Sequence, residues 1–189
     1  MNPKQQPIKI ESFYQASFPP YTRGYSAVPK SLICISEETI NKQHMILYGF
    51  DAVEILKVLK ETLVSDSSSV SILLHTPLDE VEFISGIRAL RTLLAMALNE
   101  FEKPINSKQF QFYLPITNTF DASKNILIAQ FSQIDALICN KEEVTEFEQL
   151  LNYFPTPPID ALFGSELIEK NTHILIEKVF DLFLDISRN

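Results

Sequence analysis

The chain has 189 residues, 46% of them apolar, which is enough for one domain with a real hydrophobic core. Its 16 basic and 24 acidic residues give a net charge of −8. This charge argues against non-specific binding to nucleic acid, because such binding depends on neutralising phosphates. There is no transmembrane run, and the polar start lacks the apolar segment of a signal peptide, so we expect a cytoplasmic protein that enters no membrane.

Residues 1–30 are expected to form an extended arm, because five prolines forbid a continuous helix there. The aromatic segment Phe18–Ser26 places Arg23 beside Gly24. Such a segment suits a loop that wraps a ligand, and it equally suits a clasp on a partner subunit. We favour the clasp.

Residues 31–189 are expected to form a second unit, an α/β domain. Strands are predicted at Leu32–Ser36, Met45–Phe50, Val70–Thr76, Phe110–Ile116 and Ile134–Cys139. Helices are predicted at Asp51–Val64, Leu78–Glu102, Asp121 to about Gln133, Val144–Phe154 and Glu166–Arg188. Strands that alternate with helices favour a parallel sheet with helices packed on it.

The apolar spacing also predicts which helix faces are buried. In the first helix the predicted stripe is Val53, Leu56, Leu59 and Leu63. In the second helix the face formed by Phe83, Ile87, Leu90 and Leu94 should pack on the sheet. Phe110–Ile116 is almost continuously apolar, which is typical of a strand covered on both faces.

Two architectures fit this alternation: an open doubly wound sheet, or a piece of a (β/α) barrel. A complete eight-stranded barrel usually takes about 250 residues, so this chain is too short to close one with units of ordinary length.

Cysteine and histidine are scarce. Cys34 and Cys139 each lie in an apolar run, so we interpret them as buried free thiols in a reducing cytoplasm. No two of His44, His75 and His173 have metal-ligand spacing, so no metal site is expected.

Three residues are candidates for a binding or catalytic role. Arg88 and Arg91 are three residues apart on a helix, so both guanidinium groups could reach one phosphate or carboxylate. The alternative is a solvated helix face with Glu80 and Glu82 as partners. His44 lies near a predicted strand, where a barrel would place chemistry, and the alternative is a partly buried structural histidine.

Four segments, in order, resemble the barrel domain of the adenosylcobalamin-dependent methylmalonyl-CoA mutase family. They are HMILYGFDAVEILKVL, SILLHTPLDEVEFISGIRALRTLL, FYLPITNTFDASKNILIAQFSQIDALI and GSELIEKNTHILIEKV. The segment FPPYTRG is similar to the family's Pro-Pro-Phe/Tyr-X-Arg-Gly arm. The resemblance covers most of residues 18–185 and implies a partial or degenerate TIM-barrel-like fold.

The sequence departs from the family where catalysis and cofactor binding are expected. Gln43 stands where the catalytic family has Tyr, and only Thr117 survives from the family's His-Cys-Gln-Thr-Ser-Gly strand loop. The cobalamin motif Asp-X-His-X-X-Gly is not found in these 189 residues. The resemblance is therefore closest to a shortened, non-catalytic small subunit. Adenosylcobalamin would bind a larger mutase-like partner that interconverts methylmalonyl-CoA and succinyl-CoA.

Two other hypotheses remain open at this point. In the first, the chain is a remnant that binds acyl-CoA or another anionic ligand: Arg23, Arg88 and Arg91 would contact phosphates, His44 a thioester carbonyl, and Thr117 would line the site. In the second, it is an unrelated α/β interaction domain. Because a partial barrel exposes sheet surface, we also expect the chain to pair with a larger mutase-like subunit or with itself.

Overall fold

The computed structural model of this chain describes residues 31–40, 44–65, 69–75, 79–100, 109–116, 122–154, 162 and 165–188. The arm expected over residues 1–30 lies outside these ranges. The described elements are β1 (Ile33–Ser36), η3 (Glu37–Thr39), β2 (His44–Leu47), α1 (Ala52–Val64), β3 (Ser69–Leu74), α2 (Glu80–Glu100), β4 (Gln109–Pro115), α3 (Ala122–Phe131), β5 (Ala136–Cys139), η6 (Lys141–Glu143), α4 (Val144–Leu151) and α5 (Glu166–Arg188).

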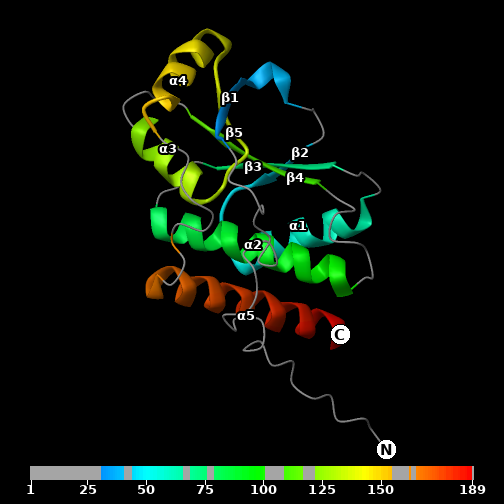
Figure 1. Ribbon diagram of the computed structural model, residues 1–189. Coiled ribbons are helices and arrows are strands. Elements are labelled where there is room, and N and C mark those ends of the chain that lie inside the picture. Colours follow the sequence, from blue (N-terminus) through cyan, green and yellow to red (C-terminus); the bar gives the residue numbers. More distant parts are fainter. Residues whose placement is uncertain are drawn as a thin grey trace, which may run out of the picture.

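The described strands form one five-stranded sheet, and every neighbouring pair is parallel (Figure 1). The order is β1-β5-β4-β3-β2. The predicted α/β fold with a parallel sheet is therefore confirmed. Four strands, β2 to β5, follow each other as consecutive barrel strands would, and β1 pairs with the last of them. Within the described residues β1 and β2 remain edges that do not pair with each other, so the barrel itself is not confirmed.

Each step from β2 to β5 moves one strand in the same direction. Right-handed crossovers then place α1, α2 and α3 on the same face of the sheet, which we call face A. Two contacts agree with this placement. The Thr62 hydroxyl of α1 lies 3.8 Å from the Met45 sulfur of β2, and the Arg91 guanidinium of α2 lies over the Phe112 ring of β4.

Face A carries the core. Its most buried side chains, each at most 5% exposed, are Cys34, Leu47, Val70, Ile72, Leu74, Phe112, Leu114, Leu137 and Cys139. The opposite face is called face B, and it carries the residues that alternate with those of face A along each strand. These residues are Ile33, Ile35, His44, Ile46, Ser69, Ser71, Leu73, Gln111, Tyr113, Pro115, Ala136 and Ile138. Cys34 and Cys139 are both buried and outside any disulfide, as predicted.

On face A, α1, α2 and α3 form an inner layer, and α5 lies outside α1 and α2. In Figure 1, α5 lies against α2 on the side away from the strands, and it also contacts α1. Because α2 is covered by the sheet on one side and by α5 on the other, its residues 83–91 are all buried. The predicted burial of Leu90 is confirmed at 0% exposure.

Two predicted burial patterns are wrong. In α1 the stripe is wrong at Val53, which is 63% exposed, whereas Leu56 and Leu59 are buried as predicted, together with Ile55, Val58 and Thr62. The strand over Phe110–Ile116 is not covered equally on both faces: Phe112 and Leu114 are fully buried, whereas Gln111 and Tyr113 on face B are only partly buried. Alternating polar and apolar residues thus separate two different environments.

Local sequence signals set the helix starts. The Asp51 carboxylate accepts hydrogen bonds from the backbone N–H groups of Val53 and Glu54, at 2.9 and 3.0 Å, and so begins α1. The Asp79 carboxylate likewise accepts from the Glu82 N–H at 2.7 Å before α2. None of the described helices combines the length and the apolar character needed to cross a membrane.

Candidate functional site

The sequence-predicted site residues fall in different parts of the fold. Arg23 and Thr117 lie outside the described residues. His44 is the first residue of β2, so it stands at the amino end of the strand rather than at the carboxyl end, where a barrel places its chemistry. Arg88 and Arg91 come from the middle of α2. Whether any of these residues contacts a substrate stays a prediction.

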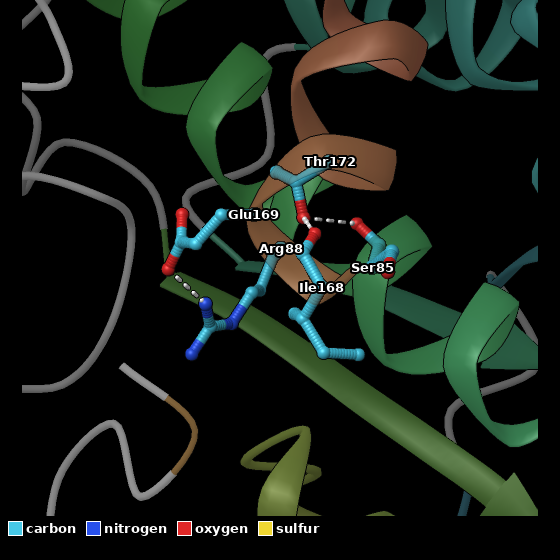
Figure 2. A network of polar contacts seen from close by, with 5 residues as sticks. All are labelled: Ser85, Arg88, Ile168, Glu169 and Thr172. Atoms are coloured by element: carbon cyan, nitrogen blue, oxygen red, sulfur yellow. Dashed lines mark hydrogen bonds and ion pairs between the residues drawn. The ribbon is translucent and has the colours of Figure 1, made fainter. Parts of the chain in front are cut away.

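Arg88 is occupied by a contact between helices (Figure 2). Its side chain is only 3% exposed, and its Nη1 atom donates to the Glu169 carboxylate of α5 at 2.7 Å. One turn away, the Thr172 hydroxyl donates to the backbone carbonyl oxygens of Ile168, at 2.7 Å, and Ser85, at 3.4 Å. Arg88 therefore belongs to a polar seam that joins α2 to α5.

Arg91 points to the other side of α2. Its guanidinium stacks over the Phe112 ring, 4.2 Å from the ring centroid, and its Nη2 atom donates to the Gln133 carbonyl oxygen at 2.5 Å. Gln133 has a φ of 53°, a conformation that non-glycine residues adopt rarely. Arg91 thus ties α2 to β4 and to the turn between α3 and β5.

The two arginines therefore do not point to one region of space. Arg88 points toward α5 on one side of α2, and Arg91 points toward the sheet on the other side. The alternative of a solvated helix face is also wrong. The partner of Arg88 is Glu169, and Glu80 instead pairs with Lys124, at 2.6 Å between Oε1 and Nζ. The periodicity of the sequence did not predict that α5 covers the Arg88 side of α2. The apolar spacing of one helix does not show which other helix packs on it.

A row of polar residues crosses face B, and sequence reasoning identified only one of its members. His44, Ser71 and Gln111 are register partners on β2, β3 and β4, so their side chains leave the same face of adjacent strands, about 4.8 Å apart. The Tyr113 hydroxyl donates to the Gln111 side-chain oxygen at 2.9 Å. The sequence feature that could have predicted this row is the alternation of polar and apolar residues in SVSILL and QFQFYLP.

The described residues of face B include no Asp, Glu, Lys or Arg. It is covered unevenly: Ala136 and Ile138 of β5 are buried, at 1% and 2% exposure, whereas Ile33 and Ile46, on the two outermost described strands, are 53% and 41% exposed. All-parallel sheets are found almost only with both faces covered. Face B therefore has the character of a surface that packs against another surface.

The carboxyl edge of the sheet, where α/β proteins usually bind ligands, is acidic in the described residues. Glu37 and Glu38 follow β1, Asp51 follows β2, and Glu142 and Glu143 follow β5. The single basic residue among them, Lys141, pairs with Glu38 at 3.0 Å. This arrangement repels an anionic ligand.

No three His, Cys, Asp or Glu side chains gather as a metal site in the part of the chain that the structure describes. A comparison with models of known protein families found none that matches, and a search of curated proteins found no match either.

Proposed function

We propose that the chain is a non-catalytic supporting subunit of a cobalamin-dependent acyl-CoA mutase, acting in the cytoplasm. In this proposal a larger mutase-like chain holds adenosylcobalamin and interconverts methylmalonyl-CoA and succinyl-CoA. The sequence resemblance suggests the class of partner. Face B is the observation that carries the proposal, because an uncharged and partly exposed face of an all-parallel sheet needs a covering surface.

Two further observations favour a supporting role over ligand chemistry in this chain. An acyl-CoA would have to displace Glu169 from Arg88, or the Gln133 carbonyl oxygen and the Phe112 ring from Arg91, because those groups already occupy the guanidinium groups. It would also meet the acidic carboxyl edge. An anion-binding remnant therefore has weaker support than a docking subunit.

The first test mixes the purified chain with a larger mutase chain from the same host and measures association by isothermal titration. We expect a stable complex that buries on the order of 1,600 Å². Ile46→Asp places a charge on face B and should weaken association at least tenfold. Val53→Asp is the matched control, because Val53 is exposed on α1, away from face B. Equal effects of the two variants, or no complex at all, would contradict the proposal.

Two controls separate the competing functions. Titration of the chain alone with adenosylcobalamin or with coenzyme A should give no heat of binding; micromolar binding of either would favour a remnant with its own ligand. Light scattering of the chain alone tests the second kind of partner, a further copy of itself. A dimer that Ile46→Asp dissociates would place the second copy on face B.

A further inference from the structure

The two cysteines of this chain lie against each other. Cys34 of β1 and Cys139 of β5 are 105 positions apart in sequence, yet their sulfur atoms are 2.9 Å apart. Both side chains are on face A, since Cys34 pairs with Leu137 and Ser36 pairs with Cys139 in the register. Their exposed fractions are 4% and 1%, and neither takes part in a disulfide.

The surroundings determine which reagents can react with this pair. Burial raises the pKa of the Cys34 thiol, and contact with Cys139 raises it further. Burial also raises the pKa of Cys139; the contact with Cys34 offsets part of this increase, and the nearby carboxylates of Glu143, Glu37 and Glu148 add to it. Both groups are therefore thiols at neutral pH, and the same carboxylates repel anionic oxidants such as glutathione disulfide.

We propose that Cys34 and Cys139 are a redox-active pair that a small uncharged peroxide converts to an intrachain disulfide and that a dithiol reductant reopens. One cysteine, as its thiolate, attacks hydrogen peroxide: an S–O bond forms, the O–O bond breaks, and the departing hydroxide takes up the thiol proton to give water. The second sulfur then attacks the resulting sulfenic acid: an S–S bond forms, the S–O bond breaks, and water leaves with the second proton.

The geometry favours the second step over competing reactions. The resolving sulfur already touches the first one, and closing the bond to about 2.05 Å requires the two atoms to approach by about 0.9 Å. Among the described strands β1 pairs with β5 alone, so it is held on one side and can absorb this shift. Burial meanwhile hinders a second protein molecule from reaching the sulfenic acid.

The disulfide would fasten the edge strand to the sheet. β1 is then held covalently to β5, across more than half of the chain, so opening of this edge becomes rarer. The expected result is a higher melting temperature of the oxidised protein and slower hydrogen exchange in β1.

The test treats the full-length chain with a molar excess of hydrogen peroxide, followed by alkylation in denaturant and intact-mass measurement. We expect both thiols to disappear together, a mass loss of two hydrogens, and full recovery with dithiothreitol. Oxidised glutathione at equal concentration should react at least tenfold more slowly. The peroxide rate should rise steadily as pH increases from 7 to 9, because raised thiol pKa values leave little thiolate at pH 7.

Cys34→Ala and Cys139→Ala are matched controls, with circular dichroism to confirm folding. Each should form a sulfenic acid that dimedone captures, and neither should form the intrachain bond. Three results would overturn the proposal: two thiols that stay alkylatable, a mass gain of oxygen in place of the loss of hydrogen, or disulfide-linked dimers as the main product.

Discussion

Gly86 gives the sharpest test of how α2 packs. A Cβ atom added to this residue would lie 2.6 Å from the Cβ of Phe50 and closer still to two carbons of the Phe50 ring. Real Cβ atoms essentially never come so near to another atom. Phe50 also packs edge-on against Phe83, with ring centroids 5.4 Å apart. Gly86 therefore lets the segment between β2 and α1 lie directly on the α2 backbone.

Gly86→Ala changes stability in two opposite ways. Alanine gains about 1 kcal/mol of helix propensity over glycine, and overpacking against Phe50 costs about 2 kcal/mol. The net expectation is a loss of about 1 kcal/mol. In a Phe50→Gly background, which removes the Cβ of Phe50 as well as its ring, the clash disappears, so the same change should stabilise the protein by about 1 kcal/mol, which gives a coupling of about 2 kcal/mol.

The measurement is urea unfolding followed by circular dichroism on the four members of this cycle. Ala97→Gly, on the same helix, is the propensity control, and its cost of about 1 kcal/mol should be the same with or without Phe50. If Gly86→Ala destabilises both backgrounds equally, the reasoning is refuted, because the conflict would then not involve Phe50.

Other substitutions test the buried helix surfaces. Leu90→Asp should leave the chain unfolded by circular dichroism, since an unpaired charge at a fully buried position costs several kcal/mol; a normal melting curve would refute the packing. In urea unfolding, Glu169→Met should cost about 3 kcal/mol and Arg88→Met about 1 kcal/mol, because Arg88 is buried whereas Glu169 is 23% exposed. The double variant should be close to wild type, and additive losses would contradict the pairing. Arg91→Lys keeps the charge but loses the planar stack on Phe112, so a loss of about 1 kcal/mol is expected, and an unchanged unfolding midpoint would show that the stack contributes nothing.

The sequence was sufficient for the strand–helix alternation, because that alternation is local. Apolar spacing located α5 at Glu166–Arg188, and Asp51 marked the start of α1 through its side-chain cap. Parallel pairing followed from the helices between strands. The pairing of β1 with β5 could not be predicted in this way, because no local sequence pattern shows which later strand lies beside β1.

The candidate site was harder to predict, because burial depends on what covers each helix face. Arg88 and Arg91 indicated an anion site only as long as one face of α2 was assumed to meet solvent. Because α5 covers one side of α2 and the sheet covers the other, both side chains need internal partners: Arg88 pairs with Glu169, and Arg91 donates to the Gln133 carbonyl oxygen. Gln111 was overlooked for the opposite reason: its apolar neighbours gave the impression of a uniformly buried strand.

The place of β1 in the sheet has a consequence for how the chain folds. The strands β2 to β5 join neighbours that are close in sequence, so each can dock soon after it leaves the ribosome. β1 is made first, yet the strand it pairs with is completed about 100 residues later. The apolar side chains of β1 therefore stay exposed until β5 has been synthesised and can pair with it. Nascent chains stalled before β5 should depend on chaperones more than any later intermediate does.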